Sequence, residues 1–231
     1  MAANADIRAT NIIYENNKMK FSLNIRKNEE YEENIHEIEF SMIGMHNIQN
    51  ALATIATGLE LKIPLTKIKA TLKNFTGVHR RFQKVGNYKG TTIIDDYGHH
   101  PVEINAALSA ARLLASETKI IAIFQPHRYS RLRDLFDEFC SSFNNADIVL
   151  LLDVYAAGEP SIKHFESNDL EKGLSKYGHK NVLYIKNQNL LAKKLLNIIK
   201  PDDLIICLGA GSITKIANNL EEELKNEDRY I

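Results

Sequence analysis

Ionisable side chains and glycines gather in four short stretches of this sequence, and each stretch follows a compact apolar run. The stretches contain carboxylates, imidazoles, guanidinium groups and closely spaced glycines. Guanidinium groups bind carboxylates and phosphates, and backbone N–H groups at a helix start can face an anion. Together these groups favour a binding site for a small anionic ligand. The four stretches are residues 95–101 (DDYGHHP), 125–131 (QPHRYSR), 153–159 (DVYAAGE) and 209–212 (GAGS).

The carboxylate and histidines of the first stretch also allow simpler explanations. Asp96 lies at the expected end of a strand, so its carboxylate should be accessible, and it could cap the turn or helix that follows. His99 and His100 are adjacent imidazoles without a third ligand at metal-binding spacing, so they predict no metal site. A capping or solvent-facing role is the alternative for these two histidines.

The arginines and glycines of the other stretches are ambiguous in the same way. Arg128 and Arg131 could pair with helix carboxylates such as Asp134. Residues 209–214 hold two of the three glycines of a G-x-G-x-x-G dinucleotide fingerprint, but Thr214 takes the third place. A tight strand-to-helix turn therefore explains these glycines without a dinucleotide.

Compact apolar runs alternate with amphipathic segments in the carboxy-terminal two thirds of the chain. Strands joined through helices are parallel, because tight hairpins cannot link parallel neighbours. The alternation predicts an α/β domain with a Rossmann-like, doubly wound and mainly parallel sheet. Ligands bind at the carboxyl ends of the strands in such sheets, where the four stretches lie. The expected strands are 91–95, 119–124, 147–153, 181–185 and 204–208, and the expected helices are 101–115, 132–143, 168–177, 190–199 and 212–224.

The amino-terminal segment has a different pattern. Short apolar stretches between residues 9 and 42, with a turn at residues 15–18, predict a small antiparallel hairpin or meander. Two amphipathic helices are expected next, over residues 47–61 and from Pro64 to about residue 72. His46 and Asn47 precede the first helix and could form its N-cap.

The change of pattern marks a domain boundary near Gly77. Helical spacing stops at residues 75–78 (FTGV), and the strand–helix alternation begins after them. We therefore expect a first domain at residues 1–76 and a second at residues 77–231.

Composition excludes several classes of protein. Lysine plus arginine and aspartate plus glutamate both total 29, so no excess positive charge favours a nucleic-acid partner. Cys140 and Cys207 are far apart and form no C-x-x-C pair, which fits a reducing compartment. No apolar signal-peptide core follows Met1, and runs such as residues 204–208 are too short to span a bilayer. We expect a cytoplasmic protein without a membrane partner.

Six sequence elements, in the same order, resemble those of the Mur ligases. The element at residues 44–51 (GMHNIQNA) is similar to the G-x-H-N-x-x-N-A element of the family's central domain, and residues 77–82 (GVHRRF) resemble its G-x-x-R-R-F junction into the carboxy-terminal domain. The other four elements resemble those of the family member that adds alanine: residues 95–101, 124–131, 155–159 and 209–212.

The resemblance implies an activity and an ATP site. Mur ligases use ATP to phosphorylate a substrate carboxylate, and the amine of an amino acid then attacks the acyl phosphate to form an amide. By resemblance, Asn47 and Asn50 hold the adenine end of ATP. Arg81 contacts ATP phosphate and stabilises its charge, and Asp96 accepts hydrogen bonds from the ribose.

The resemblance also implies a pocket for the amino acid. It places Tyr97, His99, Arg128 and Arg131 around L-alanine, with both arginines on its carboxylate. Arg128 and Arg131 are three residues apart at an expected helix start, so their side chains should point the same way.

The resemblance is to the carboxy-terminal half of a Mur ligase. This sequence has no G-x-x-G-K-[ST] phosphate-binding loop and begins among the central domain's late strands. We therefore expect residues 1–76 to be the tail of the central ATP-binding domain. The implied ligands are ATP, UDP-N-acetylmuramate and L-alanine, with Mg²⁺ ligands in the missing half. A separate chain carrying the amino-terminal half is one implied partner, and the chain alone should be inactive.

Two other functions remain open at this stage. Another Mur-type ligase, such as the one that recycles murein peptides, would share the fold and the ATP residues, although residues 97–101 (YGHHP) and 125–131 argue against it. A non-catalytic Rossmann-like module that binds an acidic metabolite or a partner protein is the second alternative, since the phosphate-binding loop is missing.

Overall fold

The computed structural model describes residues 5–16, 18–27, 30–115 and 117–229, with the side chains of residues 27 and 30–36 excepted. The chain divides into two compact units, Met1–Gly77 and Val78–Ile231. The sequence placed the boundary near Gly77, and the assignment of residues 1–76 to a larger ATP-binding domain stays a prediction. None of the helices among the described residues is long and apolar enough to cross a membrane.

The first unit begins with an antiparallel meander. Strands β1 (Ile7–Glu15), β2 (Lys18–Lys27) and β3 (Glu30–Phe40) pair in the order β1-β2-β3. Alternate side chains of β2 point into the core, which is why Met19, Phe21 and Leu23 are buried. The meander expected between residues 9 and 42 is confirmed. The turn expected at residues 15–18 includes Asn17, which lies outside the described residues.

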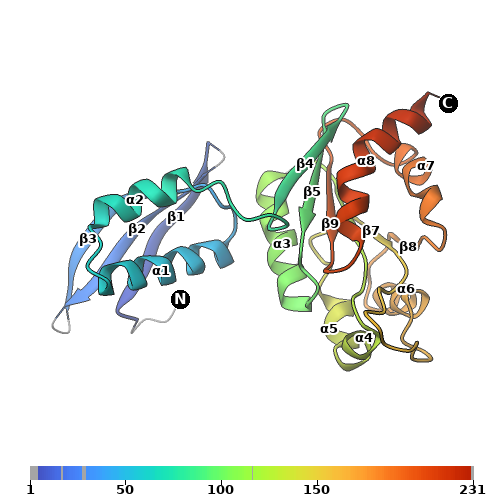
Figure 1. Cartoon of the computed structure of the whole chain (residues 1–231), viewed down its shortest axis with the longest axis horizontal. Coiled ribbons are helices and arrows are strands. Elements are labelled where there is room, and N and C mark those ends of the chain that lie inside the picture. The colour runs from blue at the N-terminus through green and yellow to red at the C-terminus, as the bar shows by residue number, and fades with distance from the viewer. Residues whose placement is uncertain (1–4, 17, 28–29, 116, 230–231) are drawn as a thin grey trace. The chain divides into compact units, whose positions relative to one another are not determined.

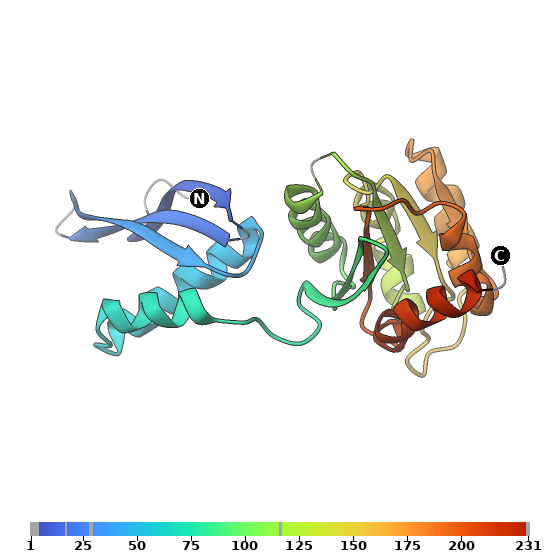
Figure 2. The same ribbon diagram turned by 90° about the horizontal axis from the view of Figure 1, so that it is seen from above.

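Two helices cover one face of this sheet. Helix α1 (Met45–Glu60) and helix α2 (Leu65–Asn74) both lie on the same side of the meander (Figures 1 and 2). Pro64 is the N-cap of α2, in agreement with the expected start of that helix. Ile48 and Ile55 of α1, two helical turns apart, pack into the core between helices and sheet.

The second unit is a six-stranded sheet in the order β4-β5-β9-β6-β7-β8. The last five pair in parallel, which confirms the mainly parallel α/β fold expected from the alternation. The edge strand β4 runs antiparallel to β5 and was missed by sequence analysis. Its residues QKVGNY are largely polar, since an edge strand buries less. The strands are β4 (Gln83–Tyr88), β5 (Thr91–Asp96), β6 (Ile120–Phe124), β7 (Ile148–Leu151), β8 (Val182–Tyr184) and β9 (Leu204–Leu208).

Helices cover both faces of this sheet, as Figure 1 shows. One core forms against α3, α4, α5 and α6, and the other against α7 and α8. Consecutive residues such as Ile205 and Ile206 belong to opposite cores, which explains the uninterrupted apolar runs. The helices are α3 (Pro101–Leu114), α4 (Tyr129–Asp134), α5 (Phe136–Ser141), α6 (Ser167–Lys176), the 3-10 turn η1 (Gln188–Leu190), α7 (Leu191–Leu196) and α8 (Ile213–Asp228).

One helix expected from the sequence is divided. The segment 132–143 was expected to be a single helix, but α4 ends at Asp134 and α5 begins at Phe136. Leu135 between them has φ −124° and ψ 29°, outside helical geometry. Helix α4 also begins at Tyr129, three residues earlier than expected, so Arg131 lies inside it.

Candidate functional site

The carboxyl ends of β5, β9, β6 and β7 meet at one edge of the parallel sheet, because these strands run in the same direction. The four stretches singled out in the sequence follow these four ends. An isolated parallel bridge between His127 and Tyr155 extends the β6–β7 pairing beyond the strands. The four stretches therefore lie at one edge of the sheet in the second unit, where the sequence predicts a ligand site.

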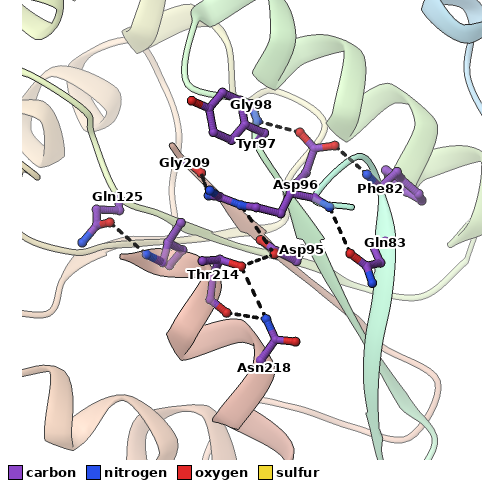
Figure 3. Close-up of polar contacts among 12 residues, drawn as sticks. Phe82, Gln83, Asp95, Asp96, Tyr97, Gly98, Gln125, Gly209, Thr214 and Asn218 are labelled. Atoms are coloured by element: carbon purple, nitrogen blue, oxygen red, sulfur yellow. Dashed lines mark hydrogen bonds and ion pairs between the residues drawn. The ribbon is translucent and has the colours of Figure 1, made fainter. Parts of the chain in front are cut away.

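Asp96 is the last residue of β5 and is buried, with 7% of its surface exposed. Its Oδ2 accepts a hydrogen bond from the backbone N–H of Phe82 at 2.8 Å, and its Oδ1 accepts one from Gly98 at 2.7 Å (Figure 3). Burial raises the pKa of Asp96, although these two bonds and the charge of Arg81 oppose the rise. The sequence predicted an accessible carboxylate, and that prediction is wrong. Contact with the ATP ribose stays a prediction.

The neighbouring Asp95 is fully buried and contacts Arg80, which sequence analysis did not single out. The Arg80 Nε lies 3.8 Å from Asp95 Oδ2, and its Nη2 donates to the carbonyl oxygen of Gly209 at 2.7 Å (Figure 3). Thr214 Oγ1 donates to the same Asp95 oxygen at 2.6 Å. Arg80 therefore links the end of β5 to the loop after β9. The R-R-F element contained this residue, but nothing local in it distinguishes the two arginines.

Arg81 is the more accessible arginine, with half of its side chain exposed. Its Nη1 lies 3.8 Å from Glu103 Oε1. The guanidinium carbons of Arg80 and Arg81 lie 4.7 Å and 5.5 Å from the centre of the Tyr97 ring. A cation over an aromatic ring is stabilised by the ring's negative face. Tyr97 thus positions the guanidinium that was predicted to meet phosphate.

Glu103 orders the start of α3 around the two histidines. Its Oε2 accepts hydrogen bonds from the backbone N–H of His99 at 3.1 Å and of His100 at 3.2 Å. His100 is the N-cap of α3, as the capping interpretation of this pair anticipated. His99 Nδ1 lies 2.9 Å from the carbonyl oxygen of Tyr97 and must donate to it, because a carbonyl only accepts.

His127 is a further residue of this edge that the sequence predictions omitted. Its Nδ1 lies 3.1 Å from Arg131 Nη1, and arginine has donors only, so Nδ1 accepts and a neutral ring carries its proton on Nε2. The ring stacks on Tyr155 with centroids 5.4 Å apart and lies 5.9 Å from the His99 ring. Burial, followed by the charge of Arg131, lowers the pKa of His127. The i, i+4 spacing of His127 and Arg131 is the feature of the sequence from which this contact could have been predicted.

The two arginines predicted to bind alanine have different partners within the chain. Arg128 precedes α4 at φ 72° and lies 3.8 Å from Glu159 Oε1, a residue of the loop after β7. Arg131 donates to the carbonyl oxygen of its own helix start, His127, at 2.8 Å. The alternative pairing with Asp134 is wrong, because Arg133 holds that carboxylate at 2.7 Å. That Arg128 and Arg131 share one ligand carboxylate stays a prediction.

Gln125 directly follows β6, and its side chain contacts the start of α8, next to the glycine turn. Its Oε1 accepts from the backbone N–H of Ile213 at 3.0 Å (Figure 3), and the Gly209 N–H donates to the Asp96 carbonyl at 3.2 Å. A Cβ on Gly211 would lie 2.5 Å from Tyr155 Cγ, so glycine is required there by close packing. Two N–H groups of the turn expected to face an anion are thus bonded inside the protein.

Asn47 and Asn50 belong to the first unit, on the first two turns of α1. The N-cap of α1 is Gly44, so the N-cap interpretation of His46 and Asn47 is wrong. Asn47 is buried, its Nδ2 donates to the Ile43 carbonyl at 2.8 Å, and its Oδ1 accepts from Asn50 Nδ2 at 3.4 Å. The two amides form a pair, and their contact with adenine stays a prediction.

Within the described residues, no group of three or more histidine, cysteine or acidic side chains is arranged to hold a metal ion. The side chains at the strand ends supply guanidinium, imidazole, phenol and carboxylate groups as hydrogen-bond donors and acceptors. Such a set suits a small ligand with an anionic group.

Comparison with known proteins extends these observations. The family model described as "Mur ligase, glutamate ligase domain" matches residues 80–211. The UDP-N-acetylmuramate–L-alanine ligase of Ruegeria pomeroyi is 45% identical over 223 residues, which are 96% of this chain and 47% of the relative. That of Geotalea uraniireducens is 47% identical over 191 residues, 83% of this chain and 42% of the relative. The chain spans about half the length of the curated relatives it matches.

Solved structures show the same fold. The MurC ligase of Thermotoga maritima aligns with a TM-score of 0.76 at 23% identity. The alignment covers 99% of this chain and 47% of the Thermotoga maritima chain. The MurF ligase of the same organism, solved in complex with ADP, aligns with a TM-score of 0.70 at 16% identity, over 97% of this chain and 48% of its own. The family match covers more than half of the chain, and the chain therefore belongs to the Mur ligase family.

Proposed function

We propose that this chain forms the amino-acid pocket and part of the ATP site of an ATP-dependent ligase that adds L-alanine to UDP-N-acetylmuramate in peptidoglycan synthesis. The observation that carries the proposal is the edge of the second unit, where arginines and imidazoles surround the carboxyl ends of parallel strands. Relatives 45% and 47% identical carry the name of that ligase. The chain is a partial enzyme in this proposal.

Each unit contains residues that are proposed to contact ATP. Asn47 and Asn50 offer paired amide donors and acceptors, which match the edge of a purine. Arg81 is half exposed and suits phosphate oxygens, and Asp96 keeps acceptor capacity for a ribose hydroxyl beside its two backbone bonds. The described residues provide no three-ligand cluster for Mg²⁺. In this proposal the residues that would hold the metal belong to the half of the enzyme that this chain does not match.

The chain's own groups would position the amino acid and stabilise charge. In the proposed reaction the substrate carboxylate takes the γ-phosphoryl group of ATP and releases ADP, which gives an acyl phosphate. The amine of the amino acid then attacks the acyl carbon, loses a proton and displaces phosphate to form the amide. Arg128 and Arg131 hold the amino acid by its carboxylate, and Arg81 offsets the negative charge that develops on the phosphate. Tyr97 and His99 shape the wall of the pocket, with rings 5.1 Å apart.

A non-catalytic binding module is the second candidate, favoured by the absence of a G-K-[ST] sequence from this chain. Such a module would bind an acidic metabolite unaided, whereas a partial ligase should bind ATP weakly and show no alanine-dependent ATP hydrolysis. Calorimetry with ATP and with L-alanine, together with a phosphate-release assay on the chain alone, separates the two.

The decisive test uses the chain joined to, or mixed with, the amino-terminal half of the Ruegeria pomeroyi relative. Arg131→Ala should raise the KM for alanine by roughly ten- to a hundredfold, because a charge-assisted hydrogen bond is worth about 1.5–3 kcal/mol. The KM for ATP should change little, and glycine should suffer as much as alanine, since both present the same carboxylate.

Arg133→Ala is the matched control for this substitution. Arg133 lies on the same helix and pairs with Asp134 at the surface, so its loss should leave both KM values unchanged. An unchanged alanine KM in Arg131→Ala, or a defect confined to ATP, would reject the proposed role of Arg131. Persistent absence of alanine-dependent turnover in the combined enzyme would reject the proposed reaction.

A further inference from the structure

Arg131 is oriented by His127, four residues earlier in the chain. Its Nη1 donates to the carbonyl oxygen of His127 at 2.8 Å and lies 3.1 Å from Nδ1 of the same residue's ring. Both acceptors are uncharged, because Nδ1 has a free lone pair only in the neutral imidazole. Two bonds to one nitrogen therefore fix the guanidinium without compensating its charge.

The neighbouring arginines are held differently. Arg128 lies 3.8 Å from the carboxylate of Glu159, and Arg133 bonds an adjacent carboxylate at 2.7 Å. Among the residues that the structure describes, no carboxylate lies within ion-pair distance of Arg131. The positive charge of Arg131 is thus the least compensated of the three, and it is available to an anionic ligand.

The ring of His127 is itself fixed by contacts with other loops. It stacks on Tyr155 at an interplanar angle of 15° with centroids 5.4 Å apart, and the His99 ring lies 5.9 Å away. Tyr155 donates its backbone N–H to the Pro126 carbonyl at 2.8 Å and packs so closely on Gly211 that a Cβ there would lie 2.5 Å from its ring. Loops after β5, β7 and β9 therefore determine where Nδ1 points.

The charges around the ring keep it neutral. Burial, followed by the charge of Arg131, lowers the pKa of His127, and the charges of His99 and Arg128 act in the same direction. Glu159 acts in the opposite direction but is the smallest of these influences. Around pH 7 the ring is therefore unprotonated, and Nδ1 can accept from the guanidinium.

We infer that His127 is a positioning residue for the amino acid: its neutral ring orients Arg131 so that the guanidinium meets the ligand carboxylate with its charge uncompensated. The inference rests on the proposed function. A guanidinium that is already oriented loses less side-chain entropy on binding, and a charge-assisted bond is stronger when no other anion competes for the donor. A carboxylate at position 127 would also orient Arg131, but it would compete with the ligand.

The first test compares three substitutions in the enzyme formed by combining this chain with the amino-terminal half of the Ruegeria pomeroyi relative. His127→Ala removes Nδ1 and should raise the KM for alanine roughly tenfold, with little change in the KM for ATP. His127→Gln supplies a neutral acceptor and should restore most of the loss. His127→Glu has the same length but a charge, so it should raise the alanine KM at least as much as His127→Ala.

A double-mutant cycle tests whether His127 acts through Arg131. In an Arg131→Ala background, His127→Ala should cause no further rise in the alanine KM, because the group that it orients is gone. Arg133→Ala is the matched control, since Arg133 is exposed on the same helix and bonds a carboxylate instead of His127. In that background the full effect of His127→Ala should remain.

Thermal unfolding followed by circular dichroism shows whether each variant is folded. If His127→Ala lowers the melting temperature, the comparison of His127→Gln with His127→Glu decides, because these two side chains differ in charge and not in length. An unchanged alanine KM in His127→Ala, equal KM values in the Gln and Glu variants, or additive losses in the cycle would overturn the inference. Turnover with any of these results rejects only the role of His127. Absence of alanine-dependent turnover in the unaltered combined enzyme rejects the proposed function, and the inference with it.

Discussion

Two adjacent aspartates at the end of β5 have different surroundings. Asp95 is fully buried and accepts from Thr214, whereas Asp96 bonds two backbone N–H groups near the edge of the sheet. Successive strand residues point to opposite faces, so the same residue type meets a different environment one position later. The role of each carboxylate therefore depends on long-range packing.

Asp96→Ala should destabilise the second unit. It removes the acceptor for the N–H groups of Phe82 and Gly98, and loss of a buried acceptor costs about 1–3 kcal/mol per bond. Urea unfolding followed by circular dichroism measures the change, with Asp96→Asn, which keeps one acceptor oxygen, as the milder comparison. An Asp96→Ala variant with unaltered stability would show that these two bonds contribute nothing.

His127 should make the stability of the second unit depend on pH. Burial and the charge of Arg131 lower the pKa of His127 in the folded chain below its ordinary value of 6.5. Between the lowered pKa and about 6.5, the unfolded chain therefore binds more protons than the folded chain. Stability should therefore rise with pH between the lowered folded value and about 6.5, and fall on acidification. Arg131, His99, Arg128 and Glu159 are the charged or titratable neighbours.

His127→Gln provides the measurement, because glutamine can still accept from Arg131 but does not titrate. Unfolding free energies of the two proteins are compared between about pH 5 and pH 7. The unaltered chain should lose more stability on acidification than the variant. Equal slopes would mean that His127 keeps its ordinary pKa in the folded chain.

At the scale of elements, one side chain joins segments far apart in the sequence. Arg80 contacts Asp95 at the end of β5 and the Gly209 carbonyl after β9, and its guanidinium lies over Tyr97. The Gly209 N–H in turn donates to the Asp96 carbonyl. These contacts link the carboxyl ends of β5 and β9, where the ligand site is proposed.

Arg80→Met should cost about 3 kcal/mol, because it leaves the fully buried Asp95 carboxylate without a neighbouring cation and removes the hydrogen bond to the Gly209 carbonyl. Arg81→Met should cost less than about 1 kcal/mol, since Arg81 is half exposed and Glu103 is also partly exposed, so their ion pair is largely solvated. Chemical denaturation of the two variants, with amide exchange at Gly209, makes the comparison. Equal losses would contradict the assignment of the structural role to Arg80.

At the scale of the whole molecule, the chain contains two compact units with separate cores. Leu108 is fully buried in the second unit and Ile55 in the first. Replacing either by alanine removes buried methyl groups and leaves a cavity. Each substitution should therefore affect the unit that contains it.

Leu108→Ala should lower the stability of the second unit by about 2–5 kcal/mol and leave the exchange protection of β1 and β2 unchanged. Ile55→Ala should do the reverse. Hydrogen exchange read by mass spectrometry reports both units in one sample. If either substitution reduced protection throughout the chain, the two units would unfold as a single cooperative body.

The sequence alone determined the class of fold and the family. Apolar runs such as residues 204–208 alternate with amphipathic helices, and a strand buried on both faces must be apolar at every position. The polar stretches directly follow the apolar runs in the sequence. Because parallel strands have their carboxyl ends at one edge of the sheet, these stretches were predicted to lie at that edge. Linear motifs such as residues 44–51 were sufficient for the resemblance, which the family match later supported.

Only the tertiary structure decided which members of each motif are packed and which are accessible. Arg80 and Arg81 share one local sequence, yet Arg80 is distinguished by a contact with Gly209, 129 residues away. The edge strand β4 escaped detection because its stabilising contacts, with β5 and α8, are not encoded in its own polar sequence. The position and tautomer of His127 likewise depend on Arg131, one helical turn away, and on the Tyr155 ring of another loop. Local sequence sets the available chemistry, and contacts between distant segments set burial, tautomer and accessibility.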